Sequence, residues 1–427
     1  MRLLLVGAFP YPHDQGSQVY FQEQAIALRE AGAEVSLLTY ASGRRPEAGR
    51  DPARGRALDG FDHQTSPGWT APASLRSGPG WGKPLGDLGL AMTLHDAVAS
   101  RSPRDAYDAI LTHNAEATGV ALQTLRGARP PIVYCAHTLL GVELSSYLKQ
   151  PKQAQNQDDP GRSHNARQGR GPIPGLLDGL GRRVDRWLGR RVDGWIALTQ
   201  SAASVMRQCS TRPGSVIPPP VPDPRQQAEP LEPKRVARRQ GLVAGEYFLY
   251  SGNLDGYQEL ELLVAAGERL GSAAPTIVLA SHDDRLASRR AALPGLTLRA
   301  IGSAGEMQAL IAGARASLVT RRAEGGFPIK LANSLAMGTP PIALLGQEWG
   351  LVDGENALIG RLHEPVASIA AAIARLASDD ALAQQLSAGA RALYLAGHRP
   401  QGCAEQTLAL IERVVAHRGG AGASGDG

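Results

Sequence analysis

The amino-acid sequence predicts an α/β fold in which two Rossmann-like domains each contain a doubly wound parallel sheet. Short apolar runs alternate with helical patterns along most of the chain, and strands separated by helices form parallel sheets through right-handed crossovers. The 427 residues exceed what one ordinary hydrophobic core accommodates. A proline-rich stretch, SVIPPPVPDPRQQAEPLEP, interrupts the alternation before it restarts, which is typical of a linker between domains.

The first domain is predicted to span residues 1–217. Its opening run, RLLLVGA, is too short for a signal peptide and leads into a helical pattern at 17–31, so it is interpreted as a strand. Further strands are predicted at EVSLLTY, YDAILTH, PPIVYCAH and GWIALTQ. Residues 42–86, rich in Gly, Pro and Arg, and the polar residues 150–175 break the pattern. Because loops of this length are usually lids, binding loops or insertions, both are expected to be flexible.

The second domain is predicted at residues 246–395, after a linker at 218–245. Its strands are expected in EYFLYSG, PTIVLAS, LTLRAIG, ASLVTRR and PPIALLG. A further helix is expected at 396–418, and a disordered glycine-rich tail at 419–427.

Composition narrows the classes of function. The formal net charge of +5 is small for the length, and only five of the 45 basic residues are lysine, so basicity alone does not argue for a nucleic-acid partner. Cys135, Cys209 and Cys403 lie far apart without metal-ligand spacing, which favours a reduced compartment over a disulfide framework. No apolar run approaches the roughly 18 residues of a membrane-spanning helix. We therefore expect a cytoplasmic protein that is soluble or attached only at a membrane surface.

Three strand ends are candidates for ligand binding, because helix N-termini present free amides beyond the carboxyl ends of parallel strands. At the first, Gly16 and Ser17 precede a helix without the GxGxxG pattern of dinucleotide sites. The turn could present amides to a phosphate or sugar, or Gly16 could simply permit the turn while Ser17 caps the helix. At the second, His113 and His137 each end an apolar run. Lone histidines are usually structural, but His137 precedes a polar loop, and its imidazole could hydrogen-bond a sugar hydroxyl or shield developing positive charge.

The third strand end, followed by EGGFPIKLANSLAMG, is the main candidate. Gly325 and Gly326 let the backbone approach a ligand closely, and Pro328 suits the first position of a helix. Two leucines one turn apart would bury one face of that helix, which leaves Lys330 and Asn333 on the other side. The helix dipole and free amides favour an anion there, and a lysine adds a full charge. The alternative is a plain amphipathic helix with a solvated lysine.

With these stretches the chain resembles the retaining nucleotide-sugar glycosyltransferases of family four, which have the GT-B fold of two Rossmann-like domains facing across a cleft. The similar segments follow the family order over nearly the whole chain: LREAGAEVSLLT, RRVDGWIALTQSAASVM, FLYSGNLDGYQELELLVAA, NSLAMG, GENALIG and DDALAQQLSAGARALY. The resemblance implies that the last helix returns to the first domain. It also implies transfer, with retention of configuration, from a nucleotide-diphosphate sugar to a glycan, lipid-linked or small-molecule acceptor.

The chain departs from the family pattern at four polar anchors. Family members usually carry two glutamates separated by seven residues. Aligned on NSLAMG, the second corresponds to Asn333, and the first falls at Gly325 with Glu324 beside it. An arginine and a lysine that bind the diphosphate in the family correspond to Asn253 and Gln258.

The altered set is still compatible with a nucleotide-sugar site. Asn333 can hydrogen-bond ribose hydroxyls without charge, and Lys330, with Arg321 or Arg322, could replace the missing diphosphate cations. The catalytic candidates are therefore His137 and Lys330, and the donor-binding candidates are Gly16, Ser17, Asn253, Gln258, Arg321, Arg322, Glu324, Gly325, Gly326, Phe327, Pro328 and Asn333.

The implied reaction requires stabilisation of the leaving diphosphate and an acceptor hydroxyl held at the anomeric carbon. In the family the leaving phosphate helps to deprotonate the acceptor. The sequence contains no Asp-x-Asp motif, which disfavours a metal-bridged scheme, so we expect no metal and no cofactor. Two alternatives remain open: a catalytically silent protein of this fold that binds a sugar or a partner, and an epimerase or hydrolase acting on nucleotide sugars.

A cluster of arginines in GRRVDRWLGRRVDGW suggests a further contact. Arg182, Arg183, Arg186 and Arg190 flank a tryptophan and could dock on anionic lipid near a lipid-linked acceptor. The alternative is an ordinary solvated helix face.

Overall fold

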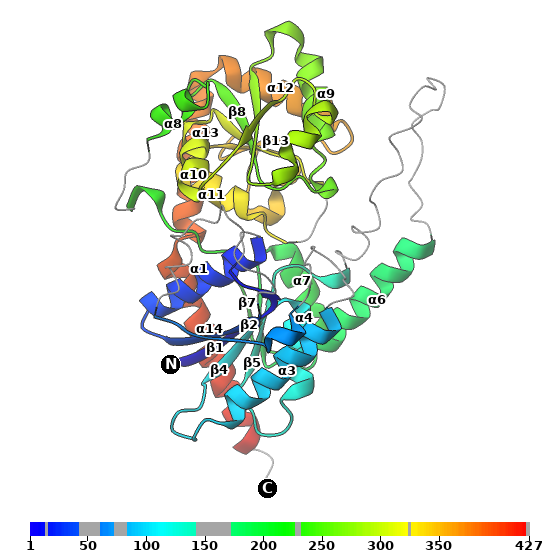
Figure 1. Ribbon diagram of the computed structural model, residues 1–427, viewed down its shortest axis with the longest axis vertical. Coiled ribbons are helices and arrows are strands. Elements are labelled where there is room, and N and C mark those ends of the chain that lie inside the picture. Colours follow the sequence, from blue (N-terminus) through cyan, green and yellow to red (C-terminus); the bar gives the residue numbers. More distant parts are fainter. Residues whose placement is uncertain are drawn as a thin grey trace.

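Two lobes, each built around a parallel sheet, make up the described part of the chain (Figure 1). The computed structural model describes residues 1–12, 16–41, 60–71, 83–141, 172–226, 232–322 and 326–423. For residues 172–175, 257, 273, 284, 285 and 419–423 it describes the backbone alone. The fold class predicted from the sequence, two Rossmann-like α/β domains, is confirmed.

The first lobe contains, among the described residues, a seven-stranded sheet in the order β3-β2-β1-β4-β5-β6-β7, with every neighbouring pair parallel. Its strands are β1 (Arg2–Pro10), β2 (Glu34–Tyr40), β3 (Asp62–Thr65), β4 (Ala109–His113), β5 (Ile132–Ala136), β6 (Gly194–Ala197) and β7 (Gly214–Val216). Its helices are α1 (Gly16–Glu30), α3 (Lys83–Ala99), α4 (Asn114–Thr124), α6 (Pro172–Gly189) and α7 (Gln200–Cys209), with a 3-10 turn η1 (Gly68–Thr70). The strand order reverses direction between β1 and β4, which creates a crevice at their carboxyl ends.

The second lobe repeats this plan with six described strands in the order β10-β9-β8-β11-β12-β13. The strands are β8 (Tyr247–Ser251), β9 (Thr276–Ser281), β10 (Thr297–Ala300), β11 (Ala316–Val319), β12 (Pro341–Ala343) and β13 (Leu358–Ile359). The helices are α8 (Pro233–Arg239), α9 (Glu261–Leu270), α10 (Ala304–Gly313), α11 (Ile329–Met337), α12 (Pro365–Ser378) and α13 (Asp380–Gly397), with 3-10 segments η2 (Pro224–Gln226), η3 (Gly256–Gln258), η4 (Gly271–Ala273), η5 (Asp284–Ala292) and η6 (Gln347–Trp349). Here the order reverses between β8 and β11.

The last helix, α14 (Pro400–Ala423), follows the second lobe but packs in the first, against α1 and β6 (Figure 1). None of the described helices combines the length and the apolar character that crossing a bilayer requires.

Alternation along β1 explains the layers of the first lobe. Leu3 and Leu5 pack with residues of α1 and α14, whereas Leu4 and Val6 pack with residues of α3, α4, α6 and α7. Successive side chains of a strand point to opposite faces, so one buried strand joins two helical layers. Burying each such side chain contributes about 1.5 to 3 kcal/mol.

The hydrophobic cluster on the α1 side of this sheet continues into the second lobe. Besides α1 and α14, it includes Phe327 and the two leucines of α11, Leu331 and Leu335, both fully buried. The start of α11 is thus held between the lobes.

The chain crosses between the lobes twice, and the two crossings are bonded to each other. The Val221 amide donates to the His398 carbonyl at 3.0 Å, and Nδ1 of His398 lies 3.0 Å from the Pro219 carbonyl oxygen. Arg391 Nη2 donates to Asp223 Oδ2 at 2.5 Å in an ion pair whose side chains are 14% and 10% exposed.

Three predicted segments differ in part from the structure. The loop predicted at 42–86 contains β3, η1 and the start of α3. The strand β3 was not predicted because it lies at the edge of the sheet and its sequence, DHQT, is polar. The linker predicted at 218–245 contains η2 and α8, and the tail predicted at 419–427 belongs to α14 as far as Ala423. Of the loop predicted at 150–175, only the end that starts α6 lies within the described residues.

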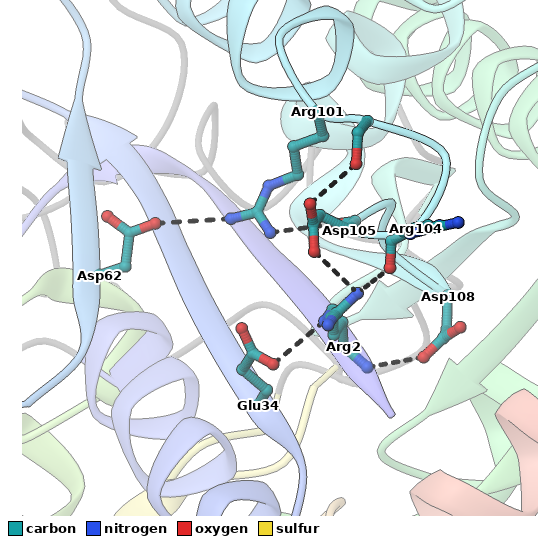
Figure 2. Close-up of polar contacts among 8 residues, drawn as sticks. Arg2, Glu34, Asp62, Arg101, Arg104, Asp105 and Asp108 are labelled. Carbon is teal, nitrogen blue, oxygen red and sulfur yellow. Dashed lines mark hydrogen bonds and ion pairs between the residues drawn. The ribbon is translucent and has the colours of Figure 1, made fainter.

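A network of exposed ion pairs joins the amino ends of the first four strands (Figure 2). The Arg2 amide donates to Asp108 Oδ2 at 2.6 Å, and its guanidinium pairs with Glu34 at 3.1 Å. Arg101 reaches Asp62 at 3.7 Å in the same network. Exposed pairs contribute little stability individually, and ligands of such sheets bind at the opposite, carboxyl ends. We therefore assign this network a structural role and no role in ligand binding.

Candidate active site

The start of α11 forms the centre of the candidate site. Pro328 is the N-cap residue, with extended backbone (φ −72°, ψ 112°), and the helix begins at Ile329. The prediction that Pro328 occupies the first helical position is therefore wrong by one residue. The proline ring suits either place, because its φ is fixed near −65° and it has no amide to satisfy. At the other end Gly338, with φ 73°, closes the helix.

Gly326 brings this turn against the first lobe. Its φ is +74°, and a Cβ atom there would lie 2.9 Å from the His137 carbonyl oxygen and 2.9 Å from Thr138 Oγ1. Trp349 Nε1 holds the same turn by donating to the Gly326 carbonyl at 3.3 Å. The predicted close approach of the backbone is made to the protein's own β5 loop. Glu324 and Gly325 lie outside the described residues.

Lys330 is part of a polar chain rather than a solvated lysine. Its Nζ donates to Gln258 Oε1 at 2.8 Å and lies 3.9 Å from the centroid of the Tyr250 ring. Gln258 Nε2 in turn donates to Asn253 Oδ1 at 3.1 Å, and Asn253 Nδ2 donates to Asp255 Oδ2 at 2.8 Å. The structure thus joins Lys330 to the two positions where the family cations were expected.

The electrostatics of Lys330 favour binding of an anion. Burial lowers the pKa of Lys330 to about 7, with a smaller contribution from the nearby charge of Arg321. Its Nζ contacts a neutral amide and an aromatic ring, and neither group neutralises its charge. An anion at the start of α11 would stabilise the charged form and raise this pKa.

The two candidate arginines behave differently. Arg322 Nε donates to both carboxylate oxygens of Glu259 at 2.9 Å, and the Arg322 amide donates to the same carboxylate at 3.2 Å. Glu259 itself has a left-handed backbone, with φ 52°. Arg321 is half-buried and close enough to affect Lys330. Asn333 is half-buried one turn along α11 from Lys330.

The first lobe contributes the start of α1. A Cβ atom on Gly16 would lie 3.5 Å from Ile329 Cγ1, so the N-termini of α1 and α11 face each other. Ser17 is half-buried in the first turn of α1. Two helix N-termini that converge with a lysine create a region of strongly positive electrostatic potential.

His137 is mostly buried, beside a second histidine and a tyrosine. It is 7% exposed, its Nε2 lies 2.8 Å from Nδ1 of the fully buried His113, and the Tyr20 ring centroid is 4.7 Å away. Burial lowers the pKa of His137 to about 3, so its imidazole is neutral at physiological pH. Both roles expected from the sequence, a hydrogen bond to a sugar hydroxyl and shielding of developing positive charge, are compatible with a neutral ring and stay predictions.

Two hollows lie at the carboxyl ends of strands in the second sheet. One of about 300 Å³ lies beyond β9 and β10 and includes Ser281, His282, Arg290 and Ile301 in its lining. The other, of about 630 Å³, lies beyond β12 between the lobes, and its lining includes Gln347, Glu348, Asp353 and Ser201. There the Ser201 hydroxyl donates to Glu348 Oε2 at 2.8 Å, across the lobe boundary.

Sequence reasoning missed two residues of this site. Tyr250 lies beneath the ammonium of Lys330, and its position at the end of a buried strand beside Gly252 was the available signal. Trp349, which donates to the Gly326 carbonyl, lies in a 3-10 turn that no sequence pattern predicted. Among the described residues, no group of three or more His, Cys, Asp and Glu side chains is arranged to hold a metal ion.

Comparisons with known proteins identify related families. The family model described as Glycosyltransferase Family 4 matches residues 15–225, and that of Glycosyl transferases group 1 matches residues 245–379. No curated protein matches the sequence significantly.

Solved glycosyltransferases share the fold over nearly the whole chain. HepE from Anabaena, in complex with UDP, is 15% identical with a TM-score of 0.67 and covers 96% of this chain and 100% of its own. Sucrose-phosphate synthase from Thermosynechococcus elongatus is 18% identical with a TM-score of 0.72, covering 97% and 99%. A glycosyltransferase from Rickettsia africae is 11% identical with a TM-score of 0.62, covering 97% and 98%. The chain is therefore a glycosyltransferase with the GT-B fold, in which a glycosyltransferase family 4 domain precedes a glycosyl transferases group 1 domain.

Proposed function

We propose that the enzyme transfers a sugar from a uridine-diphosphate sugar to a hydroxyl acceptor, with retention of configuration and without a metal ion. The observation that carries this proposal is the convergence of the α1 and α11 N-termini with Lys330, whose ammonium contacts a neutral amide and an aromatic ring. Amides, helix dipoles and an ammonium are the groups that stabilise a leaving diphosphate.

The position of Lys330 supports a relocated cation. In the resembling family, the diphosphate cations belong to the loop after the first strand of the second domain, where this chain has Asn253 and Gln258. Because Lys330 Nζ lies 2.8 Å from Gln258 Oε1, one cation is supplied to the same place from α11. Asn333, one turn further along α11, can accept a hydrogen bond from a ribose hydroxyl or donate one to it.

The hollow beyond β9 and β10 suits the base. Neighbouring parallel strands lie about 4.8 Å apart, and β9 separates β8 from β10. The ends of β8 and β10 are therefore about 10 Å apart. A nucleoside can span this distance when its diphosphate is bound at Lys330. The complexes of HepE with UDP and with UDP-glucose make uridine the base to test first.

The reaction balances without a protein nucleophile. The acceptor oxygen bonds to the anomeric carbon, the bond from that carbon to the leaving phosphate oxygen breaks, and the acceptor proton passes to the departing phosphate. Lys330 and the helix amides neutralise the charge that develops on the diphosphate. We propose that the acceptor is a glycan, a lipid-linked sugar or a small molecule bound mainly by the first lobe.

Calorimetry and product analysis test this function. UDP is expected to bind at least tenfold more tightly than uridine, since the diphosphate supplies most of the contacts, and UDP-sugars incubated with an acceptor panel are expected to give products of unchanged anomeric configuration by NMR, with or without EDTA. Absence of binding to UDP, GDP and their sugars would instead favour a silent binding protein. Nucleotide release with a free or epimerised sugar as the sole product would favour a hydrolase or epimerase.

The outer face of α6 supports contact with an anionic membrane. Arg182, Arg183 and Arg186 are exposed on this helix and Arg190 is exposed directly after it, while the two aspartates of α6 are buried. Leu176 and Leu180 are 74% and 52% exposed near its start. Apolar and cationic side chains on one face fit a lipid headgroup layer, which would place a cytoplasmic enzyme at the inner surface of the membrane.

Reversing these charges is expected to release the enzyme from anionic vesicles. The triple substitution Arg183→Glu, Arg186→Glu and Arg190→Glu should weaken binding to phosphatidylglycerol vesicles at least 100-fold, since each arginine contributes about 1 kcal/mol. Cosedimentation measures the effect. The matched control replaces the three exposed arginines of α8 with Glu: Arg235, Arg238 and Arg239. Equal loss in both variants would mean that net charge alone drives binding.

A further inference from the structure

The carboxyl ends of β4 and β5 bring two histidines into direct contact. His113 is the last residue of β4 and pairs with Cys135 in the register of β5, so His137 follows two residues further along. The imidazoles meet through Nδ1 of His113 and Nε2 of His137 at 2.8 Å, with ring planes at 89°. At this distance one nitrogen carries the hydrogen and the other accepts it.

Both rings are uncharged in this environment. His113 is fully buried and His137 is 7% exposed, beneath the aromatic rings of Tyr20 and Phe21. Burial lowers the pKa of each imidazole, and each would lower the other's if charged. A neutral imidazole has one N–H hydrogen, so the direction of the hydrogen bond between His113 and His137 determines which nitrogen of each ring is protonated.

The other nitrogen of His113 decides between the two directions. Its Nε2 is buried and has no hydrogen-bond partner within the described part of the chain. If His137 donated, His113 would carry its hydrogen on Nε2, which would be a buried N–H without an acceptor. If His113 donates from Nδ1, its Nε2 is a buried acceptor without a donor. A buried N–H without an acceptor is rarer and costs more free energy than a buried acceptor without a donor.

We propose that His113 is a positioning residue that donates from Nδ1 to Nε2 of His137 and thereby fixes His137 as the tautomer with its hydrogen on Nδ1. His137 then has no basic nitrogen left. It acts only as a hydrogen-bond donor, at Nδ1, toward an oxygen of the bound sugar. The contact with the sugar rests on the proposed function, whereas the tautomer does not.

This assignment explains how His137 serves a reaction in which the leaving phosphate takes the proton. A second base beside the anomeric carbon could activate water and hydrolyse the donor. An imidazole with its Nε2 lone pair engaged by His113 orients a sugar oxygen without that risk. The β5 loop that carries His137 also contacts the Gly326 turn, which places this donor at the lobe boundary.

Nitrogen NMR of the full-length enzyme labelled with ¹⁵N-histidine tests the proposal directly. The shifts and couplings of the two ring nitrogens identify the tautomer, and the variants His113→Asn and His137→Asn assign the signals. We expect His137 protonated on Nδ1 and bare on Nε2, unchanged between pH 5 and 8. A hydrogen on Nε2 of His137, or a charged ring, would overturn the proposal whether or not the enzyme turns over a nucleotide sugar.

Two substitutions of His113 test the positioning role. His113→Leu removes the donor, so His137 should become a mixture of tautomers and kcat for UDP-glucose turnover should fall about tenfold, the effect of one hydrogen bond, with less change in KM. His113→Asn places an amide N–H close to the position of Nδ1 and should restore the single tautomer and most of kcat. A leucine variant that folds and keeps one tautomer of His137 would refute the role of His113, as would an asparagine variant that leaves the tautomers mixed.

Discussion

Replacing Lys330 with Ala is expected to lower kcat/KM for UDP-sugar turnover by about 100-fold to 1000-fold, the loss typical of removing one group that stabilises the leaving charge. Affinity for UDP should fall by at least tenfold while affinity for uridine changes little, because Lys330 acts on the diphosphate. Lys234→Ala, which removes an exposed lysine on α8, is the matched control and should be neutral. Equal losses of UDP and uridine affinity would show that Lys330 only supports the fold.

The relocation of the cation gives a sharper test. The double variant Gln258→Lys with Lys330→Gln moves the ammonium to the loop where the resembling family carries it, and keeps a lysine and a glutamine in contact. It should recover most of the activity that Lys330→Gln alone loses. Failure to recover any of it would mean that the ammonium must be presented by α11.

Binding of UDP should also take up protons near neutral pH. Since burial holds the pKa of Lys330 near 7 and a bound diphosphate raises it, a fraction of the lysines is neutral before binding and charged after it. Affinity is therefore expected to weaken as the pH rises above about 7. Calorimetry in buffers of different ionisation enthalpy measures this uptake, which should disappear in Lys330→Ala.

Asp223→Asn is expected to destabilise the protein by about 3 kcal/mol, because it leaves the charge of Arg391 without its partner in a nearly buried pair. Urea unfolding measures the change. Glu364→Gln, which breaks the exposed pair with Arg361, is the control and should cost less than about 1 kcal/mol. A change as small as in this control would mean that water replaces the Asp223 contact.

The same pair predicts a pH dependence. Burial raises the pKa of the Asp223 carboxyl, but hydrogen bonds from the Arg391 side chain and the Arg225 amide outweigh burial and lower it overall. A carboxyl with a lower pKa in the folded state contributes stability that is complete above about pH 4 and is lost as the pH falls through the folded value. The destabilisation by Asp223→Asn should therefore shrink below pH 4.

The sequence was sufficient to predict the layered fold. It also named most residues of the candidate site, whose roles stay predictions. Apolar runs identify strands that are buried on both faces. The edge strand β3 was not predicted, because an edge strand needs few apolar residues and this one is polar. Likewise α8 was missed because prolines dominate the stretch before it, although Pro233 occupies its first position.

The contacts within the site could not be predicted from the sequence. Lys330 and Gln258 are 72 residues apart, and only the parallel pairing of β8 with β11 brings their loops together. Asn253 and Gln258 were selected through the family resemblance alone. The burial of His137 depends on α1 covering the ends of β4 and β5, which no local pattern encodes.

The paired crossings are where the chain joins the two lobes, so a rotation of one lobe relative to the other would have its axis there. The His398 ring, within one crossing, lies 4.9 Å from the Phe327 ring, two residues before the helix that carries Lys330. A rotation about this axis moves nearby atoms least and distant atoms most. In such a rotation the far rims of the lobes would move most, while the start of α11, close to the axis, would keep its contacts.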